Sequence, residues 1–452
     1  MKRALVTLAC LAALSACDMA PHYVRPAPPV PAALPGVSVD AAEMPGLPWT
    51  ALIGDQRLKT VIERALAYNR DLRAALANVE AARAQYRVQR AAQLPAVTGE
   101  AGADFSRRND SRQDNYSADI GFSAFEVDLF GRMKNLTRAA LESYLETEEG
   151  ARAARIALIA ETASAYATLA ADQELLALSR QTLASAERTL ALIRSLNGAG
   201  LTGKLDVHQA ETTVEQARSD IAANVTQVAQ DRNALDLLVG APVEDGLLPQ
   251  SLEALAGNIA KTPAGLSSDV LLQRPDVLQA EHRLKAANAD IGAARAAMFP
   301  KISLTAAIGV ASSALSSLFT GGGFAWSAGP SASMPIFGGG ARGDLDFSKA
   351  QRDVSLAQYE KAIQTAFQEV ADALAREGTI DEQRAAQQRL VVASQRSYAL
   401  ADERYRAGID TFLNSLISQR GLYGAQRSAI ATELALIRNR ILLYRVIGAD
   451  FS

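Results

Sequence analysis

Two long stretches of this chain have compositions that favour uninterrupted helix, and each is broken once by glycine. The first, residues 133–240, is interrupted at Asn197–Gly203, and the second, residues 341–447, at Arg406–Asp410. No proline and little glycine lie between these breaks, so nothing in the covalent chemistry stops a helix. Met133 to Leu196 alone, about 64 residues, would span roughly 96 Å. Runs of this length are typical of coiled coils or helical arrays, and they predict a pillar of packed helical hairpins.

The composition limits the class of protein further. The chain of 452 residues is 49% hydrophobic but only 6% aromatic, which suits close packing of alanine-rich helices better than a thick globular core. With a net charge of −3 and no basic stripe with interleaved aromatics, it is not expected to bind nucleic acid. Beyond the N-terminus, no apolar run approaches the roughly 20 residues of a membrane helix. A mature protein that spans a membrane would therefore do so with strands.

The N-terminus carries a secretory signal over residues 1–16. A basic start is followed by an apolar run and by small residues directly before Cys17. This order resembles a bacterial lipobox, which implies a diacylglycerol and an N-acyl chain on Cys17 as the only covalent lipid and no other cofactor. The alternative is an ordinary signal peptide with a chance cysteine. Asp18 resembles an inner-membrane retention signal of enteric lipoproteins, which leaves the final membrane open.

Residues 17–50 are rich in proline, alanine and valine. Such a stretch is too interrupted for a helix or a central strand, so we expect it to run extended, as a tether from the lipid anchor to the body.

The remainder of the chain contains the same series of sequence landmarks twice, which predicts an internal two-fold repeat. Three landmark pairs are separated by about 205 to 208 positions, namely Pro95 and Pro300, Phe130 and Phe337, and Gly200 and Gly408. The predicted domains are a first repeat at 51–246, an equatorial linker at 247–266 and a second repeat at 267–452. Each repeat is expected to contain a β-hairpin, at about 96–128 or 301–335, followed by its long helices.

The two predicted hairpins alternate apolar and polar residues over about ten positions per strand, which is a strand signal and also the length of a tilted transmembrane strand. In the first hairpin a polar turn is expected at Arg107–Asn115, with Ala124 on the apolar face. A soluble sheet with its apolar face on a core is the alternative. If the strands face lipid, the four strands of one chain cannot close, and lipid does not tolerate an open edge. A trimer would pool twelve strands, enough for an aqueous lumen.

Four motifs, in order, resemble those of outer-membrane efflux lipoproteins of the TolC/NodT type, the outer membrane factors of RND-type tripartite systems. They cover nearly the whole chain and lie at Cys17–Pro26, Phe125–Arg132, Leu272–Val277 and Tyr405–Leu413. The resemblance implies a homotrimer with a twelve-stranded barrel in the outer membrane and a long periplasmic barrel of helices. It implies a passive exit duct whose partners are a periplasmic adaptor, an inner-membrane RND-type transporter and outer-membrane lipid.

The resemblance also implies an iris-like gate at the glycine breaks. Residues matching the family's gate segment are Tyr405, Leu413, Ile417 and Arg420, and Asp206 occupies the matching turn of the first repeat. Leu413, Ile417 and Arg420 recur at helical spacing and so share a face. Relatives often carry aspartate at the place of Ile417, so the expected closure here is an apolar constriction that excludes water rather than a cation site. Ordinary helix packing is the alternative for each of these residues.

The chain shows no pattern of an enzyme. It has no nucleophile–base arrangement, phosphate loop or metal-ligand spacing, and its three histidines are isolated. We therefore expect no catalytic residue and no metal. The competing function is a periplasmic coiled-coil scaffold or adaptor lipoprotein without a pore, which would not explain two alternating hairpins at equivalent positions.

Overall fold

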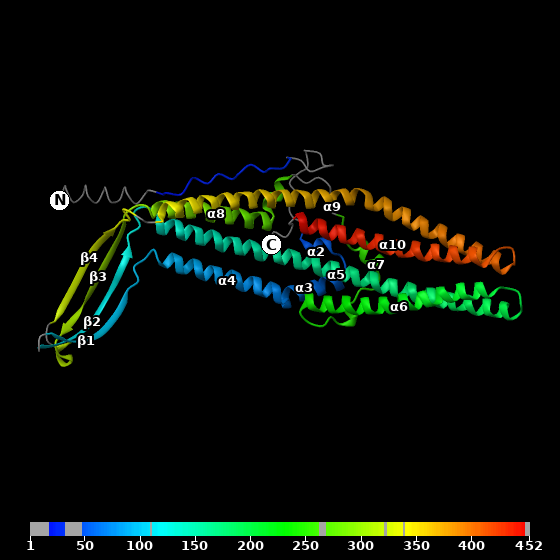
Figure 1. Cartoon of the computed structure of the whole chain (residues 1–452), viewed down its shortest axis with the longest axis horizontal. Coiled ribbons are helices and arrows are strands. Elements are labelled where there is room, and N and C mark those ends of the chain that lie inside the picture. The colour runs from blue at the N-terminus through cyan, green and yellow to red at the C-terminus, as the bar shows by residue number, and fades with distance from the viewer. Residues whose placement is uncertain are drawn as a thin grey trace. The chain divides into compact units, whose positions relative to one another are not determined.

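The computed structural model describes residues 18–31, 48–108, 111–261, 268–320, 323–337 and 340–447. The predicted signal peptide and Cys17 therefore lie outside the described residues, as does the second half of the predicted tether. The elements follow one another along the chain as drawn in Figure 1. Their bounds are α2 Trp49–Leu52, α3 Gln56–Tyr68, α4 Arg70–Ala91, β1 Thr98–Arg108, β2 Ser111–Glu126, α5 Arg132–Gly198, α6 Lys204–Val239, η1 Asp245–Leu247, α7 Leu252–Gly257, η2 Ser268–Gln273, α8 Pro275–Ala296, β3 Lys301–Ser312, η3 Leu315–Ser317, β4 Phe324–Ser333, α9 Ala341–Arg406 and α10 Phe412–Ile447.

The chain forms two compact units. One comprises residues 1–28, 76–150 and 278–362, and the other residues 29–75, 151–277 and 363–452. Each unit draws on residues from both halves of the sequence. Over the described ranges, no helix combines the length and apolar character needed to cross a membrane.

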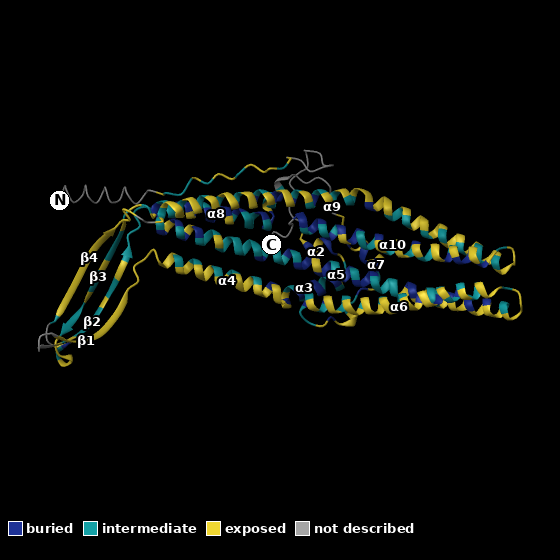
Figure 2. Cartoon of the chain, in the orientation of Figure 1, coloured by how far each residue is buried: buried dark blue, intermediate teal, exposed yellow. Residues whose placement is uncertain are grey.

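In the first unit, the described strands form one antiparallel sheet in the order β1-β2-β3-β4. The register aligns apolar residues in rows across all four strands, as in Gly99, Ile120, Ile308 and Trp326. The larger side chains of this row stay exposed, and the whole of β4 is exposed (Figure 2). In a soluble protein, the apolar face of a sheet packs against the hydrophobic core. In this single chain, the apolar face of the sheet stays exposed.

The structure corrects two details of the first predicted hairpin. The polar turn expected at 107–115 is shorter, because β1 and β2 pair up to Arg108 and Ser111. Strand pairing uses main-chain groups, so the polar side chains of this stretch do not end it. Strict alternation to Ala124 is also wrong, because a bulge lies between Phe122 and Phe125, and Ala124 has a positive φ of 53°. The extra residue places Phe125 opposite Leu304.

The corner from β2 into α5 explains the charges of the 125–132 motif. Arg132 donates to Glu126 through Nε at 2.7 Å, and Lys301 lies 3.2 Å from the same carboxylate. Asp128 accepts from the amide of Lys134 at 2.8 Å, satisfying a free donor at the start of α5. Phe130 stacks on Phe299 with ring centroids 4.7 Å apart.

The extended segment 18–28 is docked on the first unit rather than free. Asn135 donates to Asp18 at 3.1 Å, Asn288 to the carbonyl of Pro21 at 2.8 Å, and Arg295 to the carbonyl of Met19 at 3.1 Å. Further along, Tyr23 and Arg25 both donate to Glu281 of α8. We call residues 18–28 the N-terminal strap.

The second unit contains the short helices and the turns of the long ones. Its core includes Leu58, Val61 and Ile62 of α3, with Leu252 and Leu255 of α7. Arg274 of the 272–277 motif is 7% exposed and holds together Asp276, Glu369 and the carbonyl of Val446, at 2.7, 2.8 and 2.8 Å. A buried arginine with three acceptors fixes the chain as α8 begins.

Candidate functional site at the helix turns

Both long helical hairpins of the second unit turn through the same backbone device. Gly200 and Gly408 take φ values of +75° and +71°, in the left-handed region that glycine adopts without steric cost. After them, the amide of Leu201 donates to the carbonyl of Leu196 at 2.9 Å, and that of Ile409 to Arg404 at 3.0 Å. This bonding satisfies the last carbonyls of α5 and α9 and reverses the chain within a few residues.

Side chains brace each turn. In the first, Asn197 donates to the carbonyl of Thr202 at 2.7 Å, and the Thr202 hydroxyl donates to Asp206. In the second, Asp410 accepts from Asn414 at 2.6 Å and from Arg404 at 3.1 Å. These two donors, with the Thr411 amide, hold the pKa of the Asp410 carboxyl below its usual value.

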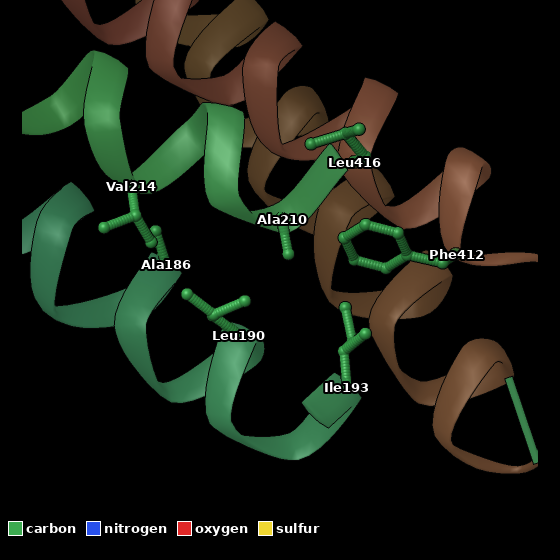
Figure 3. Packing of buried hydrophobic residues seen from close by; sticks show 7 residues of the cluster. All are labelled: Ala186, Leu190, Ile193, Ala210, Val214, Phe412 and Leu416. Carbon is green, nitrogen blue, oxygen red and sulfur yellow. The ribbon is translucent and has the colours of Figure 1, made fainter. Parts of the chain in front are cut away.

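A buried apolar cluster brings the two turns together (Figure 3). We call it the tip cluster; its buried members are Ala186, Leu190, Ile193, Ala210, Val214, Phe412 and Leu416. Phe412 and Leu416 come from the second hairpin, and the other five residues come from the first. Burying each of the larger side chains stabilises the fold by about 1.5–3 kcal/mol. The tip cluster therefore holds the two hairpins together.

Tyr405, one of the predicted site residues, packs against the tip cluster instead of lying on the surface. Its ring centroid is 5.5 Å from that of Phe412. Its hydroxyl is buried without a hydrogen-bond partner among the described residues. Burial raises the pKa of this hydroxyl, and the carboxylates of Asp206 and Asp402 add to the shift.

Leu413, Ile417 and Arg420, the other predicted residues, lie on the exposed face of α10. Leu413 is 47% and Ile417 59% exposed, although Leu416 between them is buried. Arg420 is exposed and donates to the hydroxyl of Thr212 on α6 at 3.2 Å. The first two turns of α10 thus have one apolar face in the tip cluster, with Phe412 and Leu416, and a second, exposed apolar face with Leu413 and Ile417.

Sequence reasoning missed two further exposed apolar residues at the turns, Leu201 and Ile409. Leu201 and Ile409 each follow the left-handed glycine directly. A large apolar residue directly after the turn glycine in both hairpins is the signal that could have identified them, because exposed apolar side chains that recur in this way mark contact surfaces.

Among the described residues, no three histidine, cysteine or acidic side chains gather as a metal site. His208 makes an exposed contact with Glu211 at 2.9 Å, and His282 lies 2.6 Å from Glu142 in the other unit. The site offers apolar surface and braced turns, which suit contact and constriction.

Two long helical hairpins, each preceded in the chain by a β-hairpin with exposed apolar residues, place the protein in the class of membrane channels. Comparison with known proteins agrees. The family model described as outer membrane efflux protein matches residues 61–241 and 266–449, once in each half of the chain. The chain belongs to this family of outer-membrane efflux proteins.

Individual relatives match over nearly the full length. The toluene efflux pump outer membrane protein TtgC of Pseudomonas putida is 45% identical, with 100% of this chain and 96% of the relative covered. The solvent efflux pump outer membrane protein SrpC of the same species is 43% identical, with coverages of 97% and 96%. The open-state crystal structure of the MtrE outer membrane channel of Neisseria gonorrhoeae superposes with a TM-score of 0.87 at 34% identity, covering 96% of this chain and 98% of that one. The chain is therefore an outer-membrane efflux channel protein.

Proposed function

We propose that this protein is the exit duct of a tripartite pump. It passively conducts small molecules from a periplasmic adaptor and an inner-membrane RND-type transporter to the outside. The observation that carries the proposal is the full-length likeness to efflux channel proteins, combined with helical turns that present exposed apolar residues. The names of the relatives, which refer to toluene and to solvents, point to small apolar organic molecules as cargo.

The functional unit we propose is a homotrimer with a twelve-stranded barrel. Support comes from the sheet, in which β1 and β4 form the edges of the described strands and the apolar rows stay exposed. Neither open edges nor an uncovered apolar face is stable in isolation. Three copies would pair every edge and present the apolar face to lipid. Heat-resistant trimer migration from an outer-membrane fraction is the expected result. A monomeric protein in that fraction would refute the trimer.

The gate we propose is an apolar constriction formed where three copies of α10 meet. Leu413 and Ile417 supply exposed apolar surface at helical spacing, with Arg420 one turn further along. A narrow ring of such side chains excludes water and thereby ions. Tyr405, which packs against the tip cluster, and Asp206, which braces the first turn, act behind this surface by fixing the helices that carry it.

Single-channel conductance tests the gate through Ile417→Gly. Removing the side chain from each copy should widen the constriction and raise the conductance several-fold, because conduction through an apolar neck depends steeply on its radius. Ile417→Leu keeps the apolar volume and should conduct like the wild-type protein. If all three proteins conduct equally, Ile417 is not part of the gate.

The membrane anchor we propose is the acylated Cys17. Asp18 is not free in the folded chain, since Asn135 donates to it and Lys134 and Arg138 each lie 3.7 Å from it. Mass spectrometry of the mature N-terminus should find a cysteine with three acyl chains, and an unmodified residue after cleavage elsewhere would refute the anchor.

A pore-less periplasmic scaffold, the competing function, has no support from these relatives.

A further inference from the structure

The helices that precede the two β-hairpins end in the same way. α4 and α8 are both 22 residues long. After α4 the amide of Leu94 donates to the carbonyl of Ala91 at 3.0 Å, and after α8 the amide of Phe299 donates to Ala296 at 3.1 Å. Each of these two turns leads directly into one of the repeated prolines. Leu94 and Phe299 therefore hold equivalent positions in the two repeats.

Within one chain, the second of these positions is covered by the corner from β2 into α5. Phe130 of this corner stacks on Phe299 with ring centroids 4.7 Å apart. The helices behind the two rings also meet, since His282 of α8 lies 2.6 Å from Glu142 of α5. We call this contact of α5 and its corner with α8 the intrachain seam. Its two sides come from different repeats.

The repeat counterparts of the two sides are both exposed. Phe337 is the counterpart of Phe130, and it is 100% exposed, with Ile336 beside it at 93%. Leu94, the counterpart of Phe299, is 69% exposed. The chain thus carries both surfaces of a second seam, and the described part of the same chain covers neither.

The helices behind these residues show the same contrast. Ile291 and Ala293 of α8 are buried, whereas Leu72 is the one buried residue of α4, which is described throughout (Figure 2). Val88, at the position of α4 that matches Ala293, is 63% exposed, and Phe347 near the start of α9 is 70% exposed. Exposed apolar residues gathered in this way mark a contact surface.

A second copy of the chain is the partner that fits both surfaces. Leu94 precedes β1 and Phe337 follows β4, and these strands are the two edges of the described sheet. Strands lie about 4.8 Å apart, so the edges are separated by roughly 14 Å and one chain cannot bring the two residues into contact. A copy placed edge to edge would bring the corner after β4 onto the turn before β1 of its neighbour.

We propose that Phe337 of one copy packs on Leu94 of the next, with the start of α9 along α4, so that the internal repeat supplies the contact between copies. This inference rests on the proposed homotrimer. It adds which faces of the chain meet outside the strands, and it places Ile336 and Phe337 in the interface between copies.

Disulfide formation between two co-expressed variants of the full chain tests the contact. One variant carries Leu94→Cys and the other Phe337→Cys, each with its own tag, and isolated membranes are oxidised before electrophoresis without reductant. A linked dimer that carries both tags is expected, because a disulfide requires Cα atoms within about 7 Å. Either variant alone should stay unlinked, like the unsubstituted chain, since three-fold symmetry keeps the same residue of each copy apart.

Leu94→Cys with Phe319→Cys is the matched control. Phe319 is 80% exposed, but it lies between η3 and β4, at the opposite end of the sheet from Phe337. This pair should not link. A heat-resistant trimer in which Leu94→Cys and Phe337→Cys link no more than the control pair would overturn the contact and leave the trimer standing. If no trimer migrates from the outer-membrane fraction, the proposed homotrimer is wrong, and the contact is wrong with it.

Discussion

The carboxyl groups of Asp172 on α5 and Asp231 on α6 lie close enough to influence each other's ionisation. Burial first, and then the neighbouring carboxyl, raise the pKa of Asp172 to about 7, and Arg438 on α10 only partly opposes the shift. The folded protein thus holds a proton here that the unfolded chain has lost above about pH 4. The stability that the protonated pair contributes is fully present below about pH 4, and it is lost as the pH rises towards 7.

Asp231→Asn should flatten this dependence, because it removes the second charge and lets the pKa of Asp172 fall. Between pH 5 and pH 8 the wild-type protein should lose about 1–2 kcal/mol more stability than the variant, after allowance for solvent screening. Apparent unfolding temperatures at one scan rate measure the difference. The exposed Asp346→Asn should follow the wild-type curve, and parallel curves for all three proteins would contradict the shared proton.

Glu281 holds the N-terminal strap on the first unit. Its side chain is 3% exposed and accepts from Tyr23 and Arg25, with Lys285 at 3.1 Å. Glu281→Gln should loosen the strap by about 1–3 kcal/mol, because a carboxylate with several donors is replaced by a neutral group.

Chymotrypsin cleavage after Tyr23 reports this loosening, because a docked tyrosine is protected. Cleavage should accelerate in Glu281→Gln and also in Gly292→Ala, whose new Cβ would lie 2.8 Å from the Cα of Ala20. Glu146→Gln, which loses the exposed pair with Arg283, is the control. Protection equal to that of the wild-type protein in both strap variants would show that the segment is held by other means.

At the scale of elements, the glycine turns should be sensitive to backbone conformation alone. Gly408→Ala forces an L-residue into a left-handed φ, and its Cβ would meet no atom within 4 Å, so the expected cost of about 1 kcal/mol is conformational. Gly424→Ala inside α10 also has free space and should instead stabilise the helix by roughly 0.5–1 kcal/mol. Apparent unfolding temperatures should therefore move in opposite directions, and a shared direction would contradict the turn argument.

The long helices and the strands were predictable because both depend on local pattern. Lack of proline allows α5 and α9 their full length, and a period of two marks the strands. The bulge at Ala124 could not be predicted from local pattern. It depends on the register between β2 and β3, and these two strands come from different halves of the chain. The docking of the strap likewise depends on Glu281, more than 250 residues away.

The candidate site divides in the same way. Helical spacing alone placed Leu413, Ile417 and Arg420 on one face of α10. It could not separate Tyr405, which is partly buried against the tip cluster, from residues on the surface, because five of the seven residues of that cluster come from the first hairpin. The hydrogen bonds that join Ser179, Asn224 and Tyr423 across α5, α6 and α10 also could not be predicted, since such residues in a helix carry no signal until three helices meet.

At the scale of the whole molecule, a single chain has exposed apolar side chains in both units. The sheet leaves its apolar rows uncovered in the first unit, and the turns leave Leu201, Ile409 and Ile417 exposed in the second. Surfaces of this kind mark contacts with lipid or with other chains. The proposed trimer would use the first, and a periplasmic adaptor would bind at the second.

The most direct test of the exit-duct account is photocrosslinking in the cell from a reactive residue placed at Ile409, followed by mass spectrometry of what is captured. The account predicts capture of a periplasmic adaptor, with an RND-type transporter isolated alongside it. The same probe at the exposed Val88 of α4 should capture no transporter. Capture of neither partner from Ile409, with the protein fractionating to the inner membrane, would contradict the exit duct.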